Sequence, residues 1–371
     1  MFKIGITGQA GFVGTHLFNF LNLQPNVTCV SFEDDFFKEE IKLENFVHQC
    51  DVIVHLAAMN RHNDPEVLYQ TNIKLVKQLV AAMEKVDARP HVIFSSSTQE
   101  ERDNIYGRSK KEGRAIFVDW SERNNAGFTG LVIPNVFGPF GNPFYNSVIA
   151  TFSHQLTHNE VPVIDNDGTL NLIYVAELVA EIWEVITKNK SQPIYRVPFT
   201  ATKKVSEILE LLMRFKSDYF DNGIFPSLKD DFERNSFNTF RSYIDHKTFF
   251  PFQLTKHTDE RGSFVETVKL HQGGQVSFST TKPEITRGNH FHTRKIERFA
   301  VIKGKARIDL RRIGTEEVLS FELNGESPSY VDMPVWYTHN ITNIGTEELY
   351  TIFWINEFFN PADPDTFFVA V

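Results

Sequence analysis

Residues 2–14, with the sequence FKIGITGQAGFVG, decide how the N-terminal half of the chain folds. The run Lys3–Thr7 is typical of a buried strand, and a helical pattern begins at Thr15. Between them, Gly8, Gly11 and Gly14 permit a tight turn and let the backbone approach a pyrophosphate at the start of the helix. Alone this G-x-x-G-x-x-G spacing is a weak signal, because a glycine turn between strand and helix also has a purely structural interpretation.

Strand and helix patterns alternate through the rest of this half. The predicted strands are Lys3–Thr7, Val27–Ser31, Val52–Leu56, His91–Ser95 and Gly130–Ile133. The predicted helices are Thr15–Leu23, Val67–Lys85, Tyr106–Arg123, Val175–Lys188 and Val205–Phe215. Such alternation favours right-handed crossovers and a parallel sheet of an α/β fold.

The pattern changes near Asp245. Long helical periodicity ends, and short alternating segments separated by turn residues follow. They are Gln275–Thr281, Phe299–Ile302, Ala306–Leu310, Tyr330–Met333 and Tyr350–Ile355. This texture is typical of an antiparallel β-sandwich or barrel. We therefore expect two domains, residues 1–245 and residues 246–371.

The composition of the chain limits which classes of binding partner we expect. A net charge of -9 without a basic tract argues against nucleic acid and anionic membranes, although a local positive pocket could still hold a phosphorylated small molecule. We expect no signal peptide and no membrane span, because the N-terminus runs directly into a strand and no apolar run is long enough. Cys29 and Cys50 are too few for a disulfide scaffold and suit a reducing cytoplasm.

A tyrosine and a lysine stand four residues apart in Tyr106-Gly107-Arg108-Ser109-Lys110. On a helix they share one face, and an ammonium beside a phenol lowers the phenol pKa toward the range of general acid–base catalysis. The serines 95–97 end the preceding strand, where a hydroxyl could orient a substrate carbonyl toward Tyr106. Y-x-x-x-K is common by itself, so the serines and the glycine turn carry much of this hypothesis.

Together these segments resemble the extended short-chain dehydrogenase/reductase family. The resemblance covers roughly residues 1–240 and rests on GITGQAGFVG, DVIVHLAA, YQTN, the three serines, YGRSK and IPNVFGP. It implies a Rossmann fold in which Tyr106 donates a proton, Lys110 is its partner and ribose anchor, and Ser97 is the third catalytic residue. It also implies a cofactor site formed by Gly8, Gly11, Phe12, Val13, Gly14, Leu56, Ala57, Asn72, Tyr106 and Lys110, and it places Asn135 by the substrate pocket. Members of this family act mostly on nucleotide sugars.

The nicotinamide cofactor stays open between NADH and NADPH on the residues alone. Glu33, Asp34 and Asp35 lie about 20 residues past the glycine turn, where a carboxylate favours the ribose hydroxyls of NAD. The same acidic run is equally typical of a solvated loop. Lys38 and Arg61 are the cations that could receive a 2′-phosphate.

The C-terminal domain carries a set of residues that indicates a metal site more specifically. His290 and His292 lie two apart, so on a strand both imidazoles point to one side, and Glu297 follows after a turn. His339 lies further along, between Pro334 and Asn343. Three imidazoles and a carboxylate suit Zn, Mn, Fe or Ni.

These positions resemble the two cupin motifs, H-x-H-x4-E-x6-G and P-x4-H-x3-N, with Trp336 where the second motif often has glycine. The resemblance implies a cupin barrel with one divalent metal held by His290, His292, Glu297 and His339. It does not choose among these metals, and we expect Zn. The stretches 259–266 and 287–291 also resemble dTDP-4-keto-6-deoxyglucose 3,5-epimerases, in which a histidine at the position of His290 is the base. A metal-bound imidazole lacks a free lone pair, so we interpret His290 as a ligand, and the base stays unassigned.

Domain order and the ending NEFFNPADPDTFF resemble the bifunctional enzymes of UDP-N-acetyl-L-fucosamine biosynthesis for capsular polysaccharide. The resemblance implies C3 epimerisation of a UDP-activated 4-keto-6-deoxy amino sugar in the cupin domain, reduction at C4 by NADPH, and a homodimer in the cytoplasm. Two alternatives stay open. One is a single-activity NADPH-dependent 4-ketoreductase whose cupin is structural or dimerising, and the other is a non-catalytic NADPH sensor, which the paired Tyr106 and Lys110 disfavour.

Overall fold

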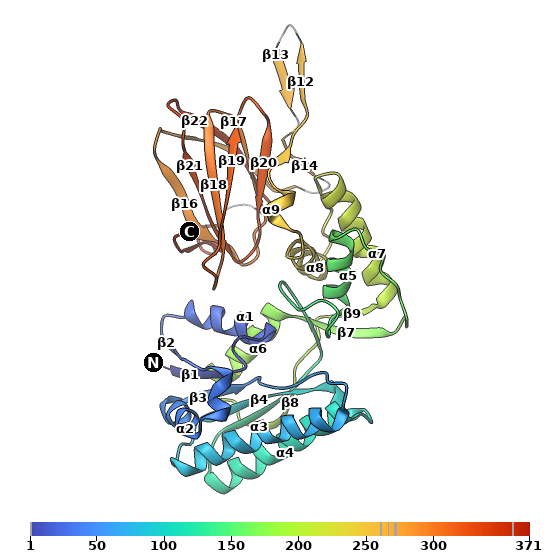
Figure 1. Cartoon of the computed structure of the whole chain (residues 1–371), viewed down its shortest axis with the longest axis vertical. Helices are drawn as coiled ribbons and strands as arrows, with labels where there is room; N and C mark the ends of the chain where they lie inside the picture. Colours follow the sequence, from blue (N-terminus) through green and yellow to red (C-terminus); the bar gives the residue numbers. More distant parts are fainter. Residues whose placement is uncertain (1, 260–261, 266, 271–272, 358–359) are drawn as a thin grey trace. The chain divides into compact units, whose positions relative to one another are not determined.

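The computed structural model describes residues 2–259, 262–265, 267–270, 273–357 and 360–371 (Figure 1). The chain divides into two compact units, one formed by residues 1–151 and 164–206 and the other by residues 152–163 and 207–371. Within the described residues, every helix is too short or too polar to cross a lipid bilayer.

The first unit is built on a six-stranded sheet in which every pairing is parallel. Its strand order is β2-β1-β3-β4-β5-β8, formed by β1 (Phe2–Thr7), β2 (Val27–Val30), β3 (Val52–His55), β4 (His91–Ser97), β5 (Phe128–Ile133) and β8 (Gln192–Arg196). The predicted Rossmann-like α/β fold is therefore confirmed. Because β1 has β2 on one side and β3 on the other, the chain reverses direction across the sheet beside β1. That is where α/β sheets bind ligands, at the carboxyl ends of the strands.

Helices cover both faces of this sheet. Helices α1 (Phe12–Asn22) and α6 (Val175–Thr187) pack on one face, and α2 (Glu40–Gln49), α3 (Pro65–Lys85) and α4 (Ile105–Asn124) lie on the other (Figure 1). Side chains alternate along each strand, so that Val52 and Val54 of β3 face α1 and α6 while Ile53 faces the opposite layer. Burial on both faces explains why the strands read as continuous apolar runs.

Side-chain caps fix where two of these helices begin. The Asp64 carboxylate accepts from the amide of Glu66 and precedes Pro65 at the first helical position of α3. The Asn104 side chain accepts from the amide of Gly107 at the start of α4. The remaining elements of this unit are β6 (Asn135–Phe137), β7 (Thr169–Tyr174) and β9 (Ala201–Lys204), which form a small sheet, and the short helices η1 (Asp34–Lys38) and η2 (Thr98–Glu101).

The second unit combines helices with antiparallel sheets. Its helical elements are α7 (Val205–Phe215), which starts at the end of the first unit, η3 (Lys216–Asp221), α8 (Asp231–Arg241) and α9 (His246–Phe249), and α5 (Val148–Thr157) continues into it. Two short pairings accompany them: β10 (Ile224–Phe225) with β14 (Lys269–Leu270), and β12 (Lys256–Asp259) with β13 (Gly262–Val265).

Ten further strands form two five-stranded sheets. One has the order β11-β20-β17-β22-β15, formed by β11 (Phe252–Gln253), β15 (Gln275–Thr281), β17 (Glu297–Lys303), β20 (Ser329–Met333) and β22 (Leu349–Ile355). The other has the order β19-β18-β21-β16-β23, formed by β16 (Thr286–Phe291), β18 (Lys305–Arg312), β19 (Val318–Asn324), β21 (Tyr337–Asn343) and β23 (Phe367–Phe368).

The domain is cupin-like, but the expected closed barrel is wrong for the described residues. The two sheets remain separate, each with its own edge strands. They are joined by apolar packing, because Ile308 and Leu310 of β18 share one core cluster with Val331 and Met333 of β20. A sandwich core of this kind needs no continuous ladder of hydrogen bonds around the domain.

The predicted boundary at Asp245 falls inside the second unit, between α8 and α9. The change from helices to strands follows α9, a few residues further on, whereas the compact units separate near Ser206. The division into domains 1–245 and 246–371 stays a prediction.

Candidate cofactor cavity and candidate metal centre

The glycine turn at the end of β1 is fixed by close backbone contacts. Gly8 has φ +72°, a conformation that favours glycine, and a Cβ there would lie 2.8 Å from the amide nitrogen of Ala57. A Cβ on Gly14 would lie 2.2 Å from the carbonyl oxygen of Gly8. The amide of Gly11 donates to that same carbonyl at 3.0 Å. The turn therefore needs glycine for its own geometry at positions 8 and 14.

A cavity of about 890 Å³ opens at the carboxyl ends of the strands in the first unit. It is large enough for a dinucleotide and part of a sugar substrate. Nearly all the residues that the sequence proposes for the cofactor and the reaction line it: Gly8, Gly11, Phe12, Val13, Gly14, Leu56, Ala57, Ser97, Tyr106 and Lys110. Asn135 of β6 also lines the cavity.

Asn72 is the predicted site residue outside this lining. Its side chain is buried and accepts from the amide of Met59 at 2.7 Å while donating to the carbonyl of Met59 at 3.0 Å. It also donates to the hydroxyl of Ser109 at 3.0 Å. Asn72 therefore supports the loop after β3 that lines the cavity, and it ties that loop to α4.

Tyr106 and Lys110 lie one turn apart near the start of α4. The Lys110 ammonium donates to the carbonyl of Ser95 at 2.9 Å and lies 5.8 Å from the centre of the Tyr106 ring. Burial lowers the pKa of Lys110 to about 8, against a smaller opposing effect of Glu100. Lys110 is thus still mostly charged at neutral pH. Its pKa is close to the values that lysines have when they take part in proton transfer.

The expected lowering of the phenol pKa is contradicted. Burial raises the pKa of Tyr106 well above its usual value, and the neighbouring phenol of Tyr145 raises it further. The reason is that the free energy lost when the phenolate is removed from water exceeds the stabilisation that it gains from the ammonium of Lys110, which is hydrogen-bonded to Ser95. Tyr106 therefore holds its proton at neutral pH, which suits a proton donor rather than a base.

The three serines at the end of β4 have different partners. Ser95 donates to the carbonyl of His55 at 3.1 Å, and the hydroxyl of Ser96 is hydrogen-bonded to the carboxylate of Glu100. Ser97 accepts from the amide of Gln99 at 3.2 Å, so its own proton stays available for donation. These partners favour Ser97 as the hydroxyl for a substrate carbonyl.

The acidic residues that follow β2 have different surroundings in the structure. Asp34 lines the cavity, whereas Asp35 lies 3.5 Å from Lys42. Arg61 also lines the cavity and donates to the side chain of Asn146 at 3.1 Å. A carboxylate and a guanidinium thus both line the cavity.

One lining residue of the cavity and one buried residue behind it were not found in the sequence. Tyr145 lines it and raises the pKa of Tyr106, but it lies in the irregular stretch after β6 that gives no periodic signal. His55, at the end of β3, is buried beside Phe94 and hydrogen-bonded to Thr7 at 2.7 Å. Burial and the nearby Lys110 lower the pKa of His55 to about 3, so it is a neutral, structural imidazole.

The four predicted metal ligands meet in the second unit. His290 lies on β16 opposite His339 of β21, next to a bulge at Gly288, while Glu297 begins β17. The ligating atoms of these residues and of His292 all lie within 4.8 Å of one another. Phe291, between the two histidines, points to the other side and stacks on Trp336. Strand alternation thus brings the two imidazoles to one point, as the H-x-H spacing predicts.

The hydrogen bonds around this cluster leave ring nitrogens free for an ion. His292 and His339 each direct Nδ1 at a backbone carbonyl, of Asp365 and Tyr337 respectively. A carbonyl only accepts, so Nδ1 carries the proton and Nε2 keeps its lone pair. Both buried Nε2 atoms and Oε2 of Glu297 lack hydrogen-bond partners among the described residues, although Oε2 lies 3.0 and 3.3 Å from them.

The electrostatics also fit a cation. Although burial opposes it, the contacts with His292 and His339 hold the pKa of Glu297 well below its usual range, so the group is a carboxylate. Burial and the neighbouring imidazoles lower the pKa of His290 to about 4, which keeps that ring neutral. Although burial opposes it, the contact with Glu297 raises the pKa of His292. Three imidazoles that give up any Nε2 proton to an incoming ion, together with one carboxylate, form a donor set that accepts a divalent transition metal, Zn among them.

Trp336 has φ +62°, which explains why the second cupin motif often has glycine at this position. Its amide donates to the carbonyl of His292 at 2.8 Å. Of the two epimerase-like stretches, residues 287–291 lie in β16, whereas Glu260, Arg261 and Glu266 and the side chains between them lie outside the described residues.

Family comparisons agree with this two-part architecture. Residues 4–197 match the model of the NAD dependent epimerase/dehydratase family, and residues 257–367 match the polysaccharide biosynthesis C-terminal domain. The first match spans more than half of the chain. The chain therefore belongs to the NAD dependent epimerase/dehydratase family.

Similarity to particular proteins extends along the whole chain. UDP-2-acetamido-2,6-beta-L-arabino-hexul-4-ose reductase of Pseudomonas aeruginosa is 31% identical, covering 100% of this chain and 99% of the relative. The crystal structure of the capsular polysaccharide assembling protein CapF from Staphylococcus aureus is 34% identical with a TM-score of 0.64, and all of both chains is covered. The predicted resemblance to the enzymes of capsular polysaccharide biosynthesis is thus confirmed. RMD from Pseudomonas aeruginosa, solved with NADPH, shares the fold of 58% of this chain and 83% of its own, at 20% identity and a TM-score of 0.53.

Proposed function

We propose that this chain is a bifunctional enzyme that acts on a UDP-2-acetamido-2,6-dideoxy-4-keto-hexose in capsular polysaccharide synthesis. Its first unit reduces the C4 ketone, and its cupin domain epimerises C3, giving a product of the UDP-N-acetyl-6-deoxy-L-talosamine type. The observation that carries the reductase part is the single cavity lined by the glycine turn together with Ser97, Tyr106 and Lys110. The name of the Pseudomonas aeruginosa relative supports the substrate class.

In the reduction, the chain's own residues bind the substrate carbonyl and supply a proton. Ser97 donates a hydrogen bond to the C4 oxygen, and Tyr106 donates its proton to that oxygen as the ketone becomes an alcohol. Lys110 holds positive charge beside the phenol and stabilises the phenolate left behind. The residues of the glycine turn would hold a nicotinamide cofactor, which would supply a hydride to C4 when bound.

We propose NADPH as that cofactor, on the resemblance of the whole chain to the bifunctional capsule enzymes. Arg61, which lines the cavity, supports this choice because it could bind a 2′-phosphate. Asp34 lines the same cavity and disfavours it, since a carboxylate there suits the free ribose hydroxyls of NADH. The competition between these two side chains makes the cofactor preference a direct test of the proposal.

In the cupin domain, His290, His292, Glu297 and His339 would hold one divalent metal, which we propose to be Zn. Such an ion supplies Lewis acidity, which polarises a carbonyl and acidifies the neighbouring C–H. The base that removes and returns the C3 proton stays unassigned. His290 does not serve as that base in this proposal, because its lone pair is needed for the metal.

A second function is favoured by the number of ligands. Four protein ligands close a tetrahedral coordination shell, as in structural zinc sites, whereas catalytic sites keep an open position. The chain would then be a single-activity NADPH-dependent 4-ketoreductase with a structural or dimerising cupin. A homodimer in the cytoplasm belongs to both alternatives and stays a prediction.

Separating the two sites tests the proposal. His339→Ala removes a metal ligand and leaves the first unit unchanged, so this variant should bind NADPH normally and should reduce a substrate that is already epimerised at C3. With the unepimerised 4-keto sugar, NADPH consumption should fall by at least about tenfold. Equal consumption with both substrates would leave the reductase in place and would favour the structural alternative for the cupin.

A further inference from the structure

The four residues that join two of the proposed metal ligands have every backbone amide bound by a side chain. Thr293, Arg294, Lys295 and Ile296 connect His292 to Glu297. The amide of Ile296 donates to the side-chain oxygen of Asn356 at 3.0 Å, and the other three amides donate to Asp365. A loop held in this way has little freedom to change the separation of the ligands at its two ends.

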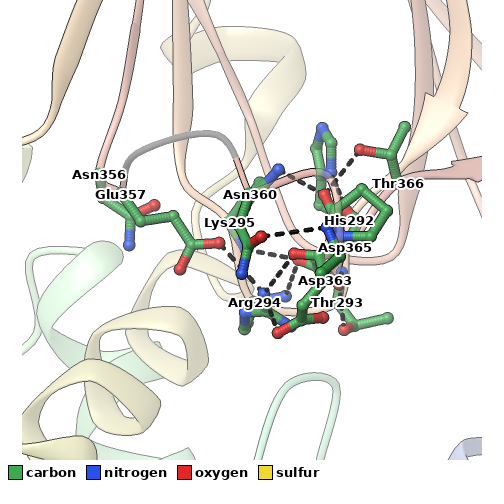
Figure 2. A network of polar contacts seen from close by, with 12 residues as sticks. His292, Thr293, Arg294, Lys295, Asn356, Glu357, Asn360, Asp363, Asp365 and Thr366 are labelled. Carbon is green, nitrogen blue, oxygen red and sulfur yellow. Dashed lines mark hydrogen bonds and ion pairs between the residues drawn. The ribbon is translucent and has the colours of Figure 1, made fainter.

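Asp365 binds most of this loop with a single carboxylate (Figure 2). Its Oδ1 accepts from the amide of Thr293 at 3.1 Å and from the hydroxyl of Thr293 at 2.6 Å. Its Oδ2 accepts from the amides of Arg294 and Lys295, each at 3.0 Å. Asp365 is buried, so its carboxylate has lost the water that would surround it in solution. Four hydrogen-bond donors take the place of that water, and hydrogen bonds to a charged acceptor are strong.

The backbone of the same residue contacts a proposed ligand directly. The carbonyl oxygen of Asp365 accepts from Nδ1 of His292, which fixes both the ring orientation and the tautomer with Nε2 free. Asp365 has φ +40°, an uncommon conformation for an aspartate, and the carbonyl is presented to His292 from that backbone. The side chain therefore fixes the loop after His292 while the main chain orients the His292 imidazole.

Neighbouring contacts hold the segment that carries Asp365. The guanidinium of Arg294 lies 2.8 Å from the carboxylate of Asp363, and the ammonium of Lys295 is hydrogen-bonded to the carbonyl of Pro364. Asp363 is exposed, so its ion pair is of the kind that contributes little to stability. The buried Asp365 is thus the residue on which the arrangement depends, and Asp363 offers a matched control.

We propose that Asp365 is a positioning residue of the metal centre. It does not ligate the ion; it preorganises His292 and Glu297 by binding the loop between them and orienting the imidazole. The proposal rests on the occupation of the metal centre and is independent of whether the cupin is catalytic or structural. Asn356 has the same effect on a smaller scale, through one amide.

Metal binding by the full chain tests this role without any substrate. The protein is stripped with a chelator, and its affinity for Co²⁺ is measured by competition while the visible absorption of the bound Co²⁺ reports ligand geometry. Asp365→Asn keeps the shape of the side chain but presents an amide N–H₂ to the loop amides. This variant should bind Co²⁺ ~10- to 100-fold more weakly and alter the spectrum, which is the usual effect of losing a residue that supports a metal ligand. Asp363→Ala should change the affinity by less than about threefold.

Circular dichroism of the stripped proteins checks that each variant is folded, and Asn356→Ala serves as a second variant if Asp365→Asn is not. Asn356→Ala should weaken binding less than Asp365→Asn but more than Asp363→Ala. A folded Asp365→Asn or Asn356→Ala variant with wild-type affinity and an unchanged spectrum would overturn the proposal. If the wild-type chain itself bound no Co²⁺, the proposed metal centre and the positioning role of Asp365 would both be refuted. The reductase part of the proposed function would be unaffected.

Discussion

Gly14→Ala is the substitution whose effect the structure determines most sharply. In an ordinary helix, replacing glycine by alanine stabilises the protein by up to about 1 kcal/mol. Here the added Cβ would lie 2.2 Å from the carbonyl oxygen of Gly8 and 2.8 Å from that of Gln9, both of them backbone atoms. Contacts this short require the turn to move by roughly 1 Å, and overpacking of this kind costs about 1–3 kcal/mol. We therefore expect net destabilisation in spite of the better helix propensity.

The same shift displaces the turn that we propose holds the cofactor pyrophosphate. The backbone amides would then no longer meet a bound pyrophosphate, so the Kd for NADPH should rise by at least about tenfold, which corresponds to about 1.4 kcal/mol. Gly168→Ala is the matched control, because a Cβ at that position meets no atom within 4 Å. It should leave both the NADPH affinity and the unfolding temperature unchanged.

Titration of NADPH by fluorescence, with thermal unfolding of both variants in parallel, measures these effects. A folded Gly14→Ala variant that binds NADPH within threefold of the wild type would refute the placement of the cofactor on the turn. Equal losses in Gly14→Ala and Gly168→Ala would show instead that any added methyl group in the first unit disturbs binding.

Three further predictions concern the reductase site. Tyr106→Phe should keep NADPH binding and lower the rate of NADPH oxidation by at least about a hundredfold, the scale of general-acid catalysis; near-normal turnover would remove Tyr106 from the mechanism. Because burial lowers the pKa of Lys110 to about 8, its positive charge is present below that pH and lost above it, so kcat/KM should fall as pH rises through about 8; a profile flat to pH 10 would contradict the role of Lys110. The wild type should have a higher kcat/KM with NADPH than with NADH, and Asp34→Asn should increase that preference; a wild-type preference for NADH would show that Asp34 binds the ribose.

Features with a local spacing could be predicted from the sequence. The strand before Gly8 and the helix after it follow from apolar periodicity, and the H-x-H pair at His290 and His292 follows from strand alternation. The parallel sheet was predicted on the same grounds from five of its six strands, and the sixth, β8, was not predicted. In each case, residues close together in the sequence specify the arrangement.

Features that depend on burial or on distant residues could not be predicted. The Y-x-x-x-K spacing gives the position of Lys110 relative to Tyr106 but not the burial that raises the phenol pKa. Asp365 lies 73 residues from His292, and no spacing rule links them. Likewise, alternating strands indicate a sandwich or a barrel, but whether the sheets close depends on how the core between them packs.

The central claim is that one chain carries two separable chemical activities on one keto sugar. It is tested most directly by incubating the protein with the UDP-activated 4-keto-6-deoxy amino sugar in deuterated water, with and without NADPH, and reading the sugar by NMR. We predict deuterium at C3 without NADPH, and reduction at C4 only when NADPH is present. Reduction at C4 with no deuterium at C3 under either condition would contradict the claim and leave a single-activity reductase.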